Sequence, residues 1–259
     1  MPKRVSKSMF LEDCQPEEVL EIIKSYSNGK SSDISIYVLK SVAHIISPLL
    51  SNYYNNFMFR GKFPDVTKTA RVTPIFKKGN KKLFQNYRPV SNLPILGKIF
   101  EKIIFNRIHN FLSSENILYD NQYGFRKHHS CSHALNHSTS FVLKSLGEKK
   151  HVLGIFIDLS KAFDTIDHYK MLKKLECYGI RGTALDLIRS YLTDRSQFSE
   201  YQETKSTSSP NPICYGVPQG SVLGPLLFLL YINDITNCSN NAEFVLFADD
   251  TNIFITGAS

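Results

Sequence analysis

Apolar residues recur at helical spacing through several stretches of this chain. Ile99, Ile103, Ile104 and Ile108 fall on one face of the segment 96–112, which predicts a long amphipathic helix. The same pattern, with a proline and acids in the first turn of the earliest stretch, predicts further helices. These lie at residues 16–23, 34–59, in the second half of 122–146, at 167–192 and, as a buried core helix, at 222–232.

Strand signals separate these helices. Residues 70–76 alternate between apolar and polar side chains, and 152–157 form a short apolar run typical of a buried central strand. Residues 243–248 and 252–255 are rich in β-branched and aromatic side chains, which predicts two strands joined at Asp249-Asp250. We also expect an extended segment at 88–94 and a loop or edge hairpin at 196–212.

Composition and charge narrow the class of protein. The 259 residues are 42% hydrophobic, which is enough for a sizeable core, and the net charge of +8 suits a polyanionic partner such as nucleic acid. The five cysteines form no CxxC pair and their number is odd, which favours a reducing compartment. We see neither a secretory signal nor an apolar stretch long enough to span a membrane. We therefore expect an intracellular protein of the nucleus or cytoplasm.

The adjacent aspartates are the first candidate for chemistry. Like charges at Asp249 and Asp250 repel one another unless a cation lies between them, and Mg²⁺ is usually held by one or two carboxylates together with substrate phosphates. Asp158 supplies a third carboxylate at the end of the strand predicted at 152–157. An ordinary Asp-rich turn at 249–250 and a helix N-cap or turn residue at 158 are the plainer alternatives. Three carboxylates on two strands favour a two-metal site for phosphoryl transfer.

Five segments carry a resemblance to a known family. In order and approximate spacing, three resemble the palm motifs of reverse transcriptases, namely Phe156–His168, Gly216–Pro225 and Phe247–Asp250. The segments Asn86–Lys98 and Gln122–Arg126 resemble the preceding finger motifs. The residues of these motifs are most similar to those of the reverse transcriptases of non-LTR retrotransposons, in particular Jockey-like elements.

This resemblance implies an α+β right-hand polymerase fold that copies an RNA template onto a DNA primer from dNTPs. It divides the chain into a helical N-terminal extension at 1–60, fingers at 61–150 and a palm at 151–259, with finger elements near 195–212. Asp158, Asp249 and Asp250, with the carbonyl of Leu159, would ligate two Mg²⁺ ions, for which Mn²⁺ can substitute. No membrane partner is implied, and protein partners are not indicated.

The resemblance also assigns residues to the nucleotide and the template. Arg88 matches an arginine that clamps the triphosphate, Lys77 or Lys78 would add a second cation, and Gln219 would lie near the sugar. Phe163 matches the aromatic residue that excludes a 2′-hydroxyl, although periodicity alone favours a core position; a solvated loop is the alternative for the lysines. The residues implied for the template are Gln122, Gly124, Phe125, Arg126 and Gly220.

Other polar residues near these motifs have plainer interpretations. Asp164 and Asp167 match family positions that are not metal ligands, and we interpret them as structural. For Tyr191, Arg195 and Gln197 a contact with nucleic acid is conceivable, but a solvated helix end is the preferred interpretation.

The chain departs from the family pattern mainly in its extent. It stops nine residues after Asp250, so we expect a C-terminally truncated domain without a thumb, whose palm sheet exposes apolar surface. We expect weak, salt-sensitive binding of template-primer and little processive synthesis. The alternative function is a catalytically idle remnant of a transposable element that only binds nucleic acid.

Overall fold

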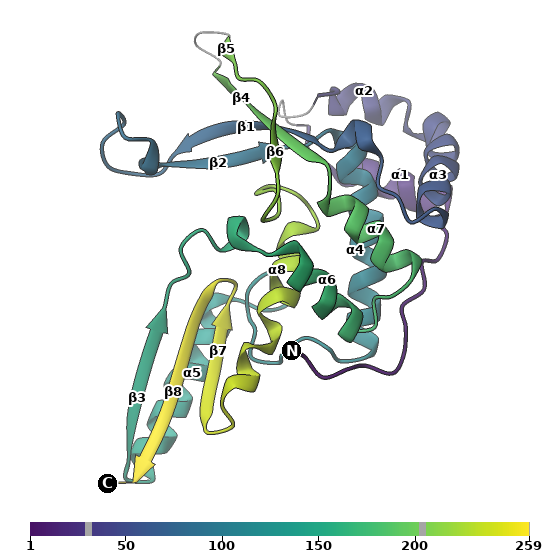
Figure 1. The fold of residues 1–259 in the computed structure, drawn as a ribbon. Helices are drawn as coiled ribbons and strands as arrows, with labels where there is room; N and C mark the ends of the chain where they lie inside the picture. The colour runs from purple at the N-terminus through teal and green to yellow at the C-terminus, as the bar shows by residue number, and fades with distance from the viewer. Residues whose placement is uncertain (29–32, 202–205, 259) are drawn as a thin grey trace.

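The computed structural model describes residues 1–28, 33–201 and 206–258 and mixes helices with two sheets. Figure 1 shows the sheets at opposite ends of the molecule, with most helices between and beside them. The α-helices are α1 (Pro16–Ser25), α2 (Ile36–Ser41), α3 (Ala43–Phe59), α4 (Ile95–Ser114), α5 (Cys131–Gly147), α6 (His168–Cys177), α7 (Thr183–Leu192) and α8 (Gly224–Ile232). The strands are β1 (Thr69–Phe76), β2 (Tyr87–Asn92), β3 (Lys150–Ile157), β4 (Arg195–Tyr201), β5 (Ser206–Thr207), β6 (Asn211–Ile213), β7 (Ala242–Phe247) and β8 (Asp250–Ala258).

The main core is built around α4. Its four isoleucines, predicted to share one face, are all buried, and they join one apolar cluster with residues of α1, α3, α6, α7 and α8. Helix α8 is buried along nearly its whole length, as its continuous apolar sequence predicted. The helix expected at 167–192 is instead two helices, α6 and α7, because glycines with positive φ at Gly179 and Gly182 interrupt it.

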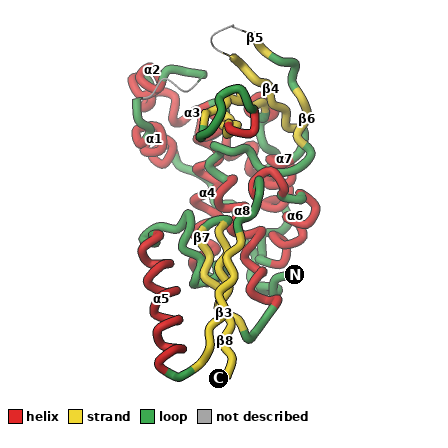
Figure 2. Tube along the Cα trace, turned by 90° about the vertical axis from the view of Figure 1, so that its left-hand side faces the viewer, coloured by secondary structure: helices red, strands yellow, loops and turns green. Residues whose placement is uncertain are grey.

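The N-terminal helices pack against α4, as Figure 2 shows from the side. The helix predicted at 34–59 is divided into α2 and α3 by Val42, whose φ of −105° and ψ of 5° are not helical. The sequence predicts a break from Ser25 to Ser32, between the helices expected at 16–23 and 34–59. The break begins where α1 ends, and its residues 29–32 lie outside the described part of the chain.

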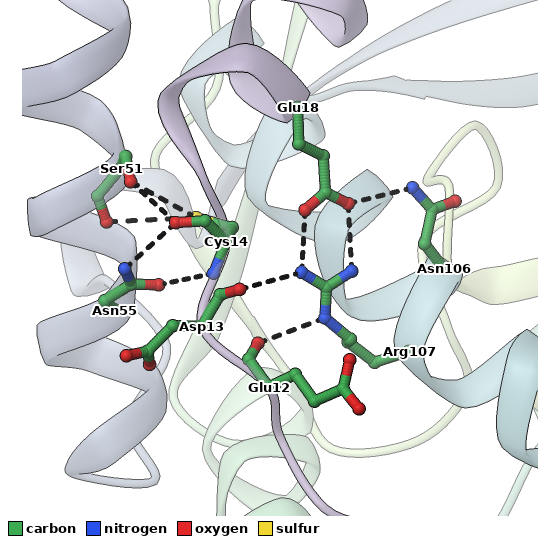
Figure 3. Close-up of polar contacts among 8 residues, drawn as sticks. All are labelled: Glu12, Asp13, Cys14, Glu18, Ser51, Asn55, Asn106 and Arg107. Carbon is green, nitrogen blue, oxygen red and sulfur yellow. Dashed lines mark hydrogen bonds and ion pairs between the residues drawn. The ribbon is translucent and has the colours of Figure 1, made fainter.

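Arg107 of α4 fastens the segment that precedes and begins α1. Its guanidinium forms a two-pronged ion pair with Glu18, with N–O distances of 2.9 and 2.6 Å. It also donates to the backbone carbonyls of Glu12 and Asp13 at 3.0 and 3.3 Å, and Figure 3 shows all these partners around one side chain. Such paired charge-assisted bonds specify orientation as well as contact.

Cys14 connects the same segment to α3. Its backbone N–H donates to the side chain of Asn55 over 2.8 Å, and its carbonyl accepts from Asn55 and from Ser51 over 3.1 and 2.7 Å. Residues 12–14, which precede α1, are thus hydrogen-bonded to both α3 and α4 (Figure 3).

The larger sheet contains β1, β2, β4, β5 and β6. Strands β1 and β2 are antiparallel and form a hairpin in which Phe76 pairs with Tyr87, while β1 and β4 are parallel. The strand expected at 70–76 and the edge elements expected at 196–212 are present, apart from residues 202–205, which are outside the described part. The predicted basic loop at 77–82 joins β1 to β2.

The smaller sheet has the order β3-β8-β7, with antiparallel pairing throughout. The prediction of a buried central strand at 152–157 is therefore wrong, because β8 is central and β3 pairs only with β8 among the described strands. Leu153 and Phe156 are 59% and 73% exposed. An apolar run shows that a strand lacks polar side chains, but it does not show whether other strands or helices pack against that strand. The apolar surface expected on this sheet is exposed.

A small second core holds α5 against the sheet. Ala134 of α5 packs with Val245 of β7 and Phe254 of β8, and all three are buried. No helix in the described residues is both long and apolar enough to cross a membrane.

Replacing Arg107 with alanine should lower the free energy of unfolding by about 2 kcal/mol, because the partly buried Glu18 carboxylate loses a charged hydrogen-bond partner. Lys7→Ala is the matched control: Lys7 also forms an ion pair, with Glu115 at 2.8 Å, but its side chain is 71% exposed. That variant should change the free energy by less than about 1 kcal/mol. Urea unfolding followed by circular dichroism measures both, and equal losses would contradict a specific role for the Arg107 cluster.

Candidate active site

The β7–β8 hairpin carries the two adjacent aspartates where β8 begins, and its turn lies one residue earlier than predicted. Phe247 at the end of β7 pairs with Asp250 at the start of β8, so Ala248 and Asp249 alone form the turn. Ala248 has a φ of +56°. A residue with a Cβ pays for such a conformation with about 1–3 kcal/mol and keeps it only where its surroundings determine it.

Asp158 lies beside this hairpin. It directly follows β3, whose last residue, Ile157, pairs with Thr251. One further step along the antiparallel ladder brings Asp158 next to Asp250. Both side chains line one hollow of about 660 Å³ between α5 and the sheet, whose wall is otherwise mostly apolar.

The third aspartate does not join that hollow. Asp249 is half-buried at the turn, whereas Asp158 and Asp250 are exposed. Among the described residues, no group of three or more His, Cys, Asp or Glu side chains is arranged to hold a metal ion. Successive residues at a strand end point to opposite faces, and neighbouring carboxylates repel one another. The joint ligation of metal by all three aspartates and the Leu159 carbonyl thus stays a prediction.

Two carboxylates at one hollow still form a donor set that fits a hard divalent cation. Proteins commonly hold Mg²⁺ through one or two carboxylates and complete its coordination with substrate phosphates and water. Asp158 and Asp250 meet that minimum.

The glycine-containing loop 216–220 passes close to two other parts of the chain. Gly216 has a φ of +78°, and a Cβ on it would lie 2.7 Å from the Cα of Asp164. Gly220 has a φ of +114°, and a Cβ there would lie 2.6 Å from the carbonyl oxygen of Ser91 in β2. The carbonyl of Gln219 accepts a 2.7 Å hydrogen bond from the N–H of Ser91. The loop therefore links the segment after β3 to β2.

Phe163 lies in the short 3₁₀ helix Ala162–Thr165 and is half-buried. Its ring stacks on Phe228 of α8 with centroids 5.0 Å apart, and it meets the ring of Phe125 edge-on at 6.0 Å. Phe163 thus packs partly against the core and keeps an accessible part, so its sequence-based assignments as a core residue and as a wall of the nucleotide site are compatible.

Arg88 and Lys77 lie on the β1–β2 hairpin. Arg88 is paired with Ile75 in the hairpin, and Lys77 follows β1 directly. Both side chains are exposed, and neither forms an ion pair with another described residue. Figure 1 shows this hairpin projecting from the body on the same side as the smaller sheet.

The loop at 122–126 has a mixed environment. Gln122 and Gly124 are buried, whereas Phe125 is 55% exposed. Arg126 donates from Nη1 to the carbonyls of Tyr119 and Gln122 at 2.8 and 3.3 Å, so it holds its own loop together. The template contacts expected of these residues and of Gly220 stay predictions.

A model of the family described as "Reverse transcriptase (RNA-dependent DNA polymerase)" matches residues 75–259. The chain belongs to the reverse transcriptase family. This match covers the end of β1, all of β2, the 216–220 loop and the aspartate hairpin, and it confirms the resemblance found in the sequence.

The relatives of this reverse transcriptase chain come from non-LTR mobile elements. It is 32% identical over 243 residues to a "Probable RNA-directed DNA polymerase from transposon BS" of Drosophila melanogaster, which covers 90% of this chain and 26% of the relative. It is 36% identical over 188 residues to the "RNA-directed DNA polymerase from mobile element jockey" of Drosophila funebris, covering 71% of this chain and 20% of the relative. The chain thus spans about a quarter or less of the length of these relatives. Reverse transcriptases generally use divalent metal ions.

One functional support of the reverse transcriptase site was missed in the sequence. Glu101 of α4 is 1% exposed, and its carboxylate accepts hydrogen bonds from the N–H groups of Val222 and Leu223 at 2.7 and 3.0 Å. Val222 and Leu223 lie directly before α8, so the carboxylate holds the backbone between the 216–220 loop and that helix. Burial raises the pKa of Glu101 above its usual range. Its position three residues before Ile104, on the apolar face of α4, was the available signal.

Tyr191 and Arg195 correct another interpretation. They were assigned to a solvated helix end, but they are 0% and 2% exposed. The Arg195 guanidinium lies over the Tyr191 ring at 4.8 Å and donates to the Tyr191 carbonyl at 3.0 Å, and the Tyr191 hydroxyl donates to Glu101 at 3.4 Å. The arginine is therefore part of a buried polar cluster. The local sequence around Arg195 indicated only the end of a helix. It could not indicate burial, because Glu101, the partner of Tyr191, lies 90 residues earlier in the chain.

Glu101→Ala should lower the free energy of unfolding by about 3 kcal/mol, because it leaves two N–H groups without an acceptor and the buried Arg195 without a nearby carboxylate. Glu101→Gln keeps an oxygen for the two N–H groups and should lose less. Glu17→Ala, at an exposed acid of α1, should stay within about 0.5 kcal/mol. Chemical unfolding ranks the three variants, and a change for Glu101→Ala as small as that for Glu17→Ala would refute the buried role.

Proposed function

We propose that this chain is the RNA-directed DNA polymerase domain of a non-LTR retrotransposon, which transfers nucleotides from dNTPs to a primer 3′-hydroxyl on an RNA template. The observation that carries the proposal is that Asp158 and Asp250 line one hollow, beside the turn that holds Asp249. Membership of the reverse transcriptase family supports the same reaction.

Asp158, Asp249 and Asp250, with the carbonyl of Leu159, are the proposed holders of two divalent cations, Mg²⁺ or its substitute Mn²⁺. Bound there, the ions would acidify the primer 3′-hydroxyl and neutralise charge on the triphosphate and the departing pyrophosphate. The protein itself contributes position: Asp158 directly follows β3, Asp250 begins the neighbouring strand β8, and Asp249 lies in the turn before it.

The nucleotide is proposed to lie between the β1–β2 hairpin and the 216–220 loop. The exposed guanidinium of Arg88 suits bidentate contact with phosphate, and Lys77 adds a point charge from the adjacent loop. Gln219 is fastened to β2 through its carbonyl, which leaves its side chain to approach the sugar. Phe163 would form the wall against a 2′-hydroxyl.

The template strand is proposed to run along the loop that contains Gly124, Phe125 and Arg126 and past Gly220. The exposed ring of Phe125 suits stacking on a base. Gln122 was expected here as well, but its buried side chain forms hydrogen bonds with the backbone of Gly124 and Ala248. The net charge of +8 would support sequence-independent binding of template and primer.

In this proposal the chain is divided as in other right-hand polymerases. Residues 1–60 form the helical N-terminal extension, 61–150 the fingers and 151–259 the palm, and β4 to β6 near 195–212 join the finger sheet. The parallel pairing of β4 with β1 supports that last assignment. Retrotransposition is the process in which such a domain would act.

Primer extension on an RNA template with Mg²⁺ tests the proposal. Asp249→Ala combined with Asp250→Ala should reduce extension by at least about 100-fold, because loss of metal ligands removes several kcal/mol of transition-state stabilisation. Asp164→Asn is the matched control, because Asp164 lies in the segment after β3, as Asp158 does, but has no proposed metal role. This variant should keep activity within about threefold. Equal extension by the wild type and the double variant, or none by either with intact template binding, would favour the idle remnant.

Phe163→Val should relax the choice of sugar. The smaller side chain would admit a 2′-hydroxyl, so incorporation of ribonucleotides relative to deoxyribonucleotides should rise by at least about tenfold, which is near the discrimination that one steric contact provides. Phe228→Leu controls for loss of ring packing, because Phe228 stacks on Phe163 from the α8 side. An unchanged ratio in Phe163→Val, with dNTP incorporation retained, would leave Phe163 as a core residue only.

A further inference from the structure

The loop that joins α4 to α5 pairs with β7 next to the aspartate turn. Leu246 of β7 donates its N–H to the carbonyl of Asn121 over 2.9 Å, and its carbonyl accepts from the N–H of Tyr123 over 2.8 Å. Gln122 and Leu246 form an isolated parallel bridge. The loop thereby extends the smaller sheet on the side of β7 that β8 does not occupy.

The side chain of Gln122 then reaches the turn itself. It is 2% exposed. Its amide oxygen accepts from the N–H of Ala248 at 3.0 Å and from the N–H of Gly124 at 2.8 Å, while its amide nitrogen donates to the carbonyl of Ala248 at 3.3 Å. One side chain therefore satisfies both backbone polar groups of the residue before Asp249.

The close approach of the two segments requires glycine at position 124. A Cβ there would lie 2.1 Å from the backbone nitrogen of Ala248 and 2.7 Å from its Cα. Contact between a Cβ and backbone atoms at that distance cannot be relieved by rotating a side chain. The backbone of the loop, and not only the amide of Gln122, is thus seated directly on the turn.

Ala248 needs such support because its φ is positive, which alanine adopts only when its surroundings determine it. Glutamine meets the need because a neutral amide both accepts and donates at one end of the side chain. We propose that Gln122 is a positioning residue, which fixes the backbone at Ala248 and so sets the directions in which Asp249 and Asp250 point. This inference rests on the proposed function, in which those carboxylates hold divalent cations.

The same loop also touches the proposed nucleotide wall. Phe125, three residues after Gln122, places its ring edge-on to that of Phe163 at 6.0 Å. The loop at 122–125 therefore contacts the carboxylate turn through its first residue and the sugar-selecting ring through its last.

Gln122→Ala tests the positioning role in the full chain. Amide hydrogen exchange at Ala248 and Asp249 should become at least about tenfold faster, because the acceptor and donor that hold the turn are lost. The Mg²⁺ concentration for half-maximal primer extension should rise by at least about tenfold and kcat should fall, while KM for dNTP should stay within about twofold, because the effect acts through the metal ligands.

Asn121→Ala is the matched control. It removes a neighbouring amide in the same loop, whose Nδ2 donates to Glu243 and to Tyr119 at 2.8 and 3.1 Å, at the far end of β7. It should leave the Mg²⁺ dependence and the exchange at Ala248 unchanged. Equal effects of the two alanine variants on both readouts would overturn the proposal and leave Gln122 with a general structural role.

Gln122→Glu provides a second test if the alanine variant does not fold. A protonated carboxyl accepts and donates as the amide does, whereas a carboxylate cannot donate to the Ala248 carbonyl. Protection of the Ala248 amide, corrected for the intrinsic pH dependence of exchange, should therefore fall between about pH 5 and pH 8 in this variant but not in the wild type. A pH-independent protection equal to that of the wild type would contradict the clamp.

These readouts separate the inference from the proposed function. If the chain is not a polymerase, the wild type shows no extension and Asp249→Ala leaves Mn²⁺ binding, measured by electron paramagnetic resonance, unchanged. Exchange at Ala248 still reports whether Gln122 holds the turn. Fast exchange in Gln122→Ala with unchanged Mn²⁺ binding would show a clamp that has no effect on metal, and would overturn the positioning role.

Discussion

The buried carboxylate of Glu101 is the interaction on which the arrangement of this domain most depends. It lies in the middle of α4, the helix around which the main core is built, and it accepts hydrogen bonds from the start of α8 and from Tyr191 of α7. Arg195 of β4 joins the same cluster through Tyr191. These hydrogen bonds connect α4 with α7 and with the start of α8 and, through Tyr191 and Arg195, with the larger sheet.

The candidate site depends on that arrangement through its loops. The 216–220 loop ends at the two N–H groups that Glu101 binds, and it passes β2 at Ser91 and the segment after β3 at Asp164. Phe163 packs on α8 and reaches Phe125. The carboxylate hairpin lies in a separate small core with α5 and is joined to the rest by the loop at 121–125. The proposed nucleotide site thus packs on the main core and the proposed metal site on the small second core, and the loop at 121–125 contacts both sites.

Much of this could be predicted where local pattern and tertiary burial agree. The isoleucines of α4 face the core as their spacing indicated, α8 is buried as its apolar run indicated, and the two aspartates lie in the predicted hairpin. The predictions were wrong where burial depends on neighbours distant in sequence. The apolar run of β3 became an exposed edge, and Arg195 became a buried residue. The hydrogen bond between the Gln122 amide and Ala248 could not be predicted, because Ala248 lies 126 residues away and the local sequence around Gln122 does not indicate it as a partner.

The family, the order of the motifs and the residue types that the proposed chemistry needs could be read from the sequence, because side-chain identity and spacing are local properties of the chain. The tertiary structure alone decided which of those side chains meet. Strand register placed Asp158 beside Asp250 and left Asp249 at the turn, and a close backbone contact at Gly124 seated a distant loop on that turn. Hydrogen bonding between strands and contact between loops depend on distances through space, and a pattern along the chain does not contain them.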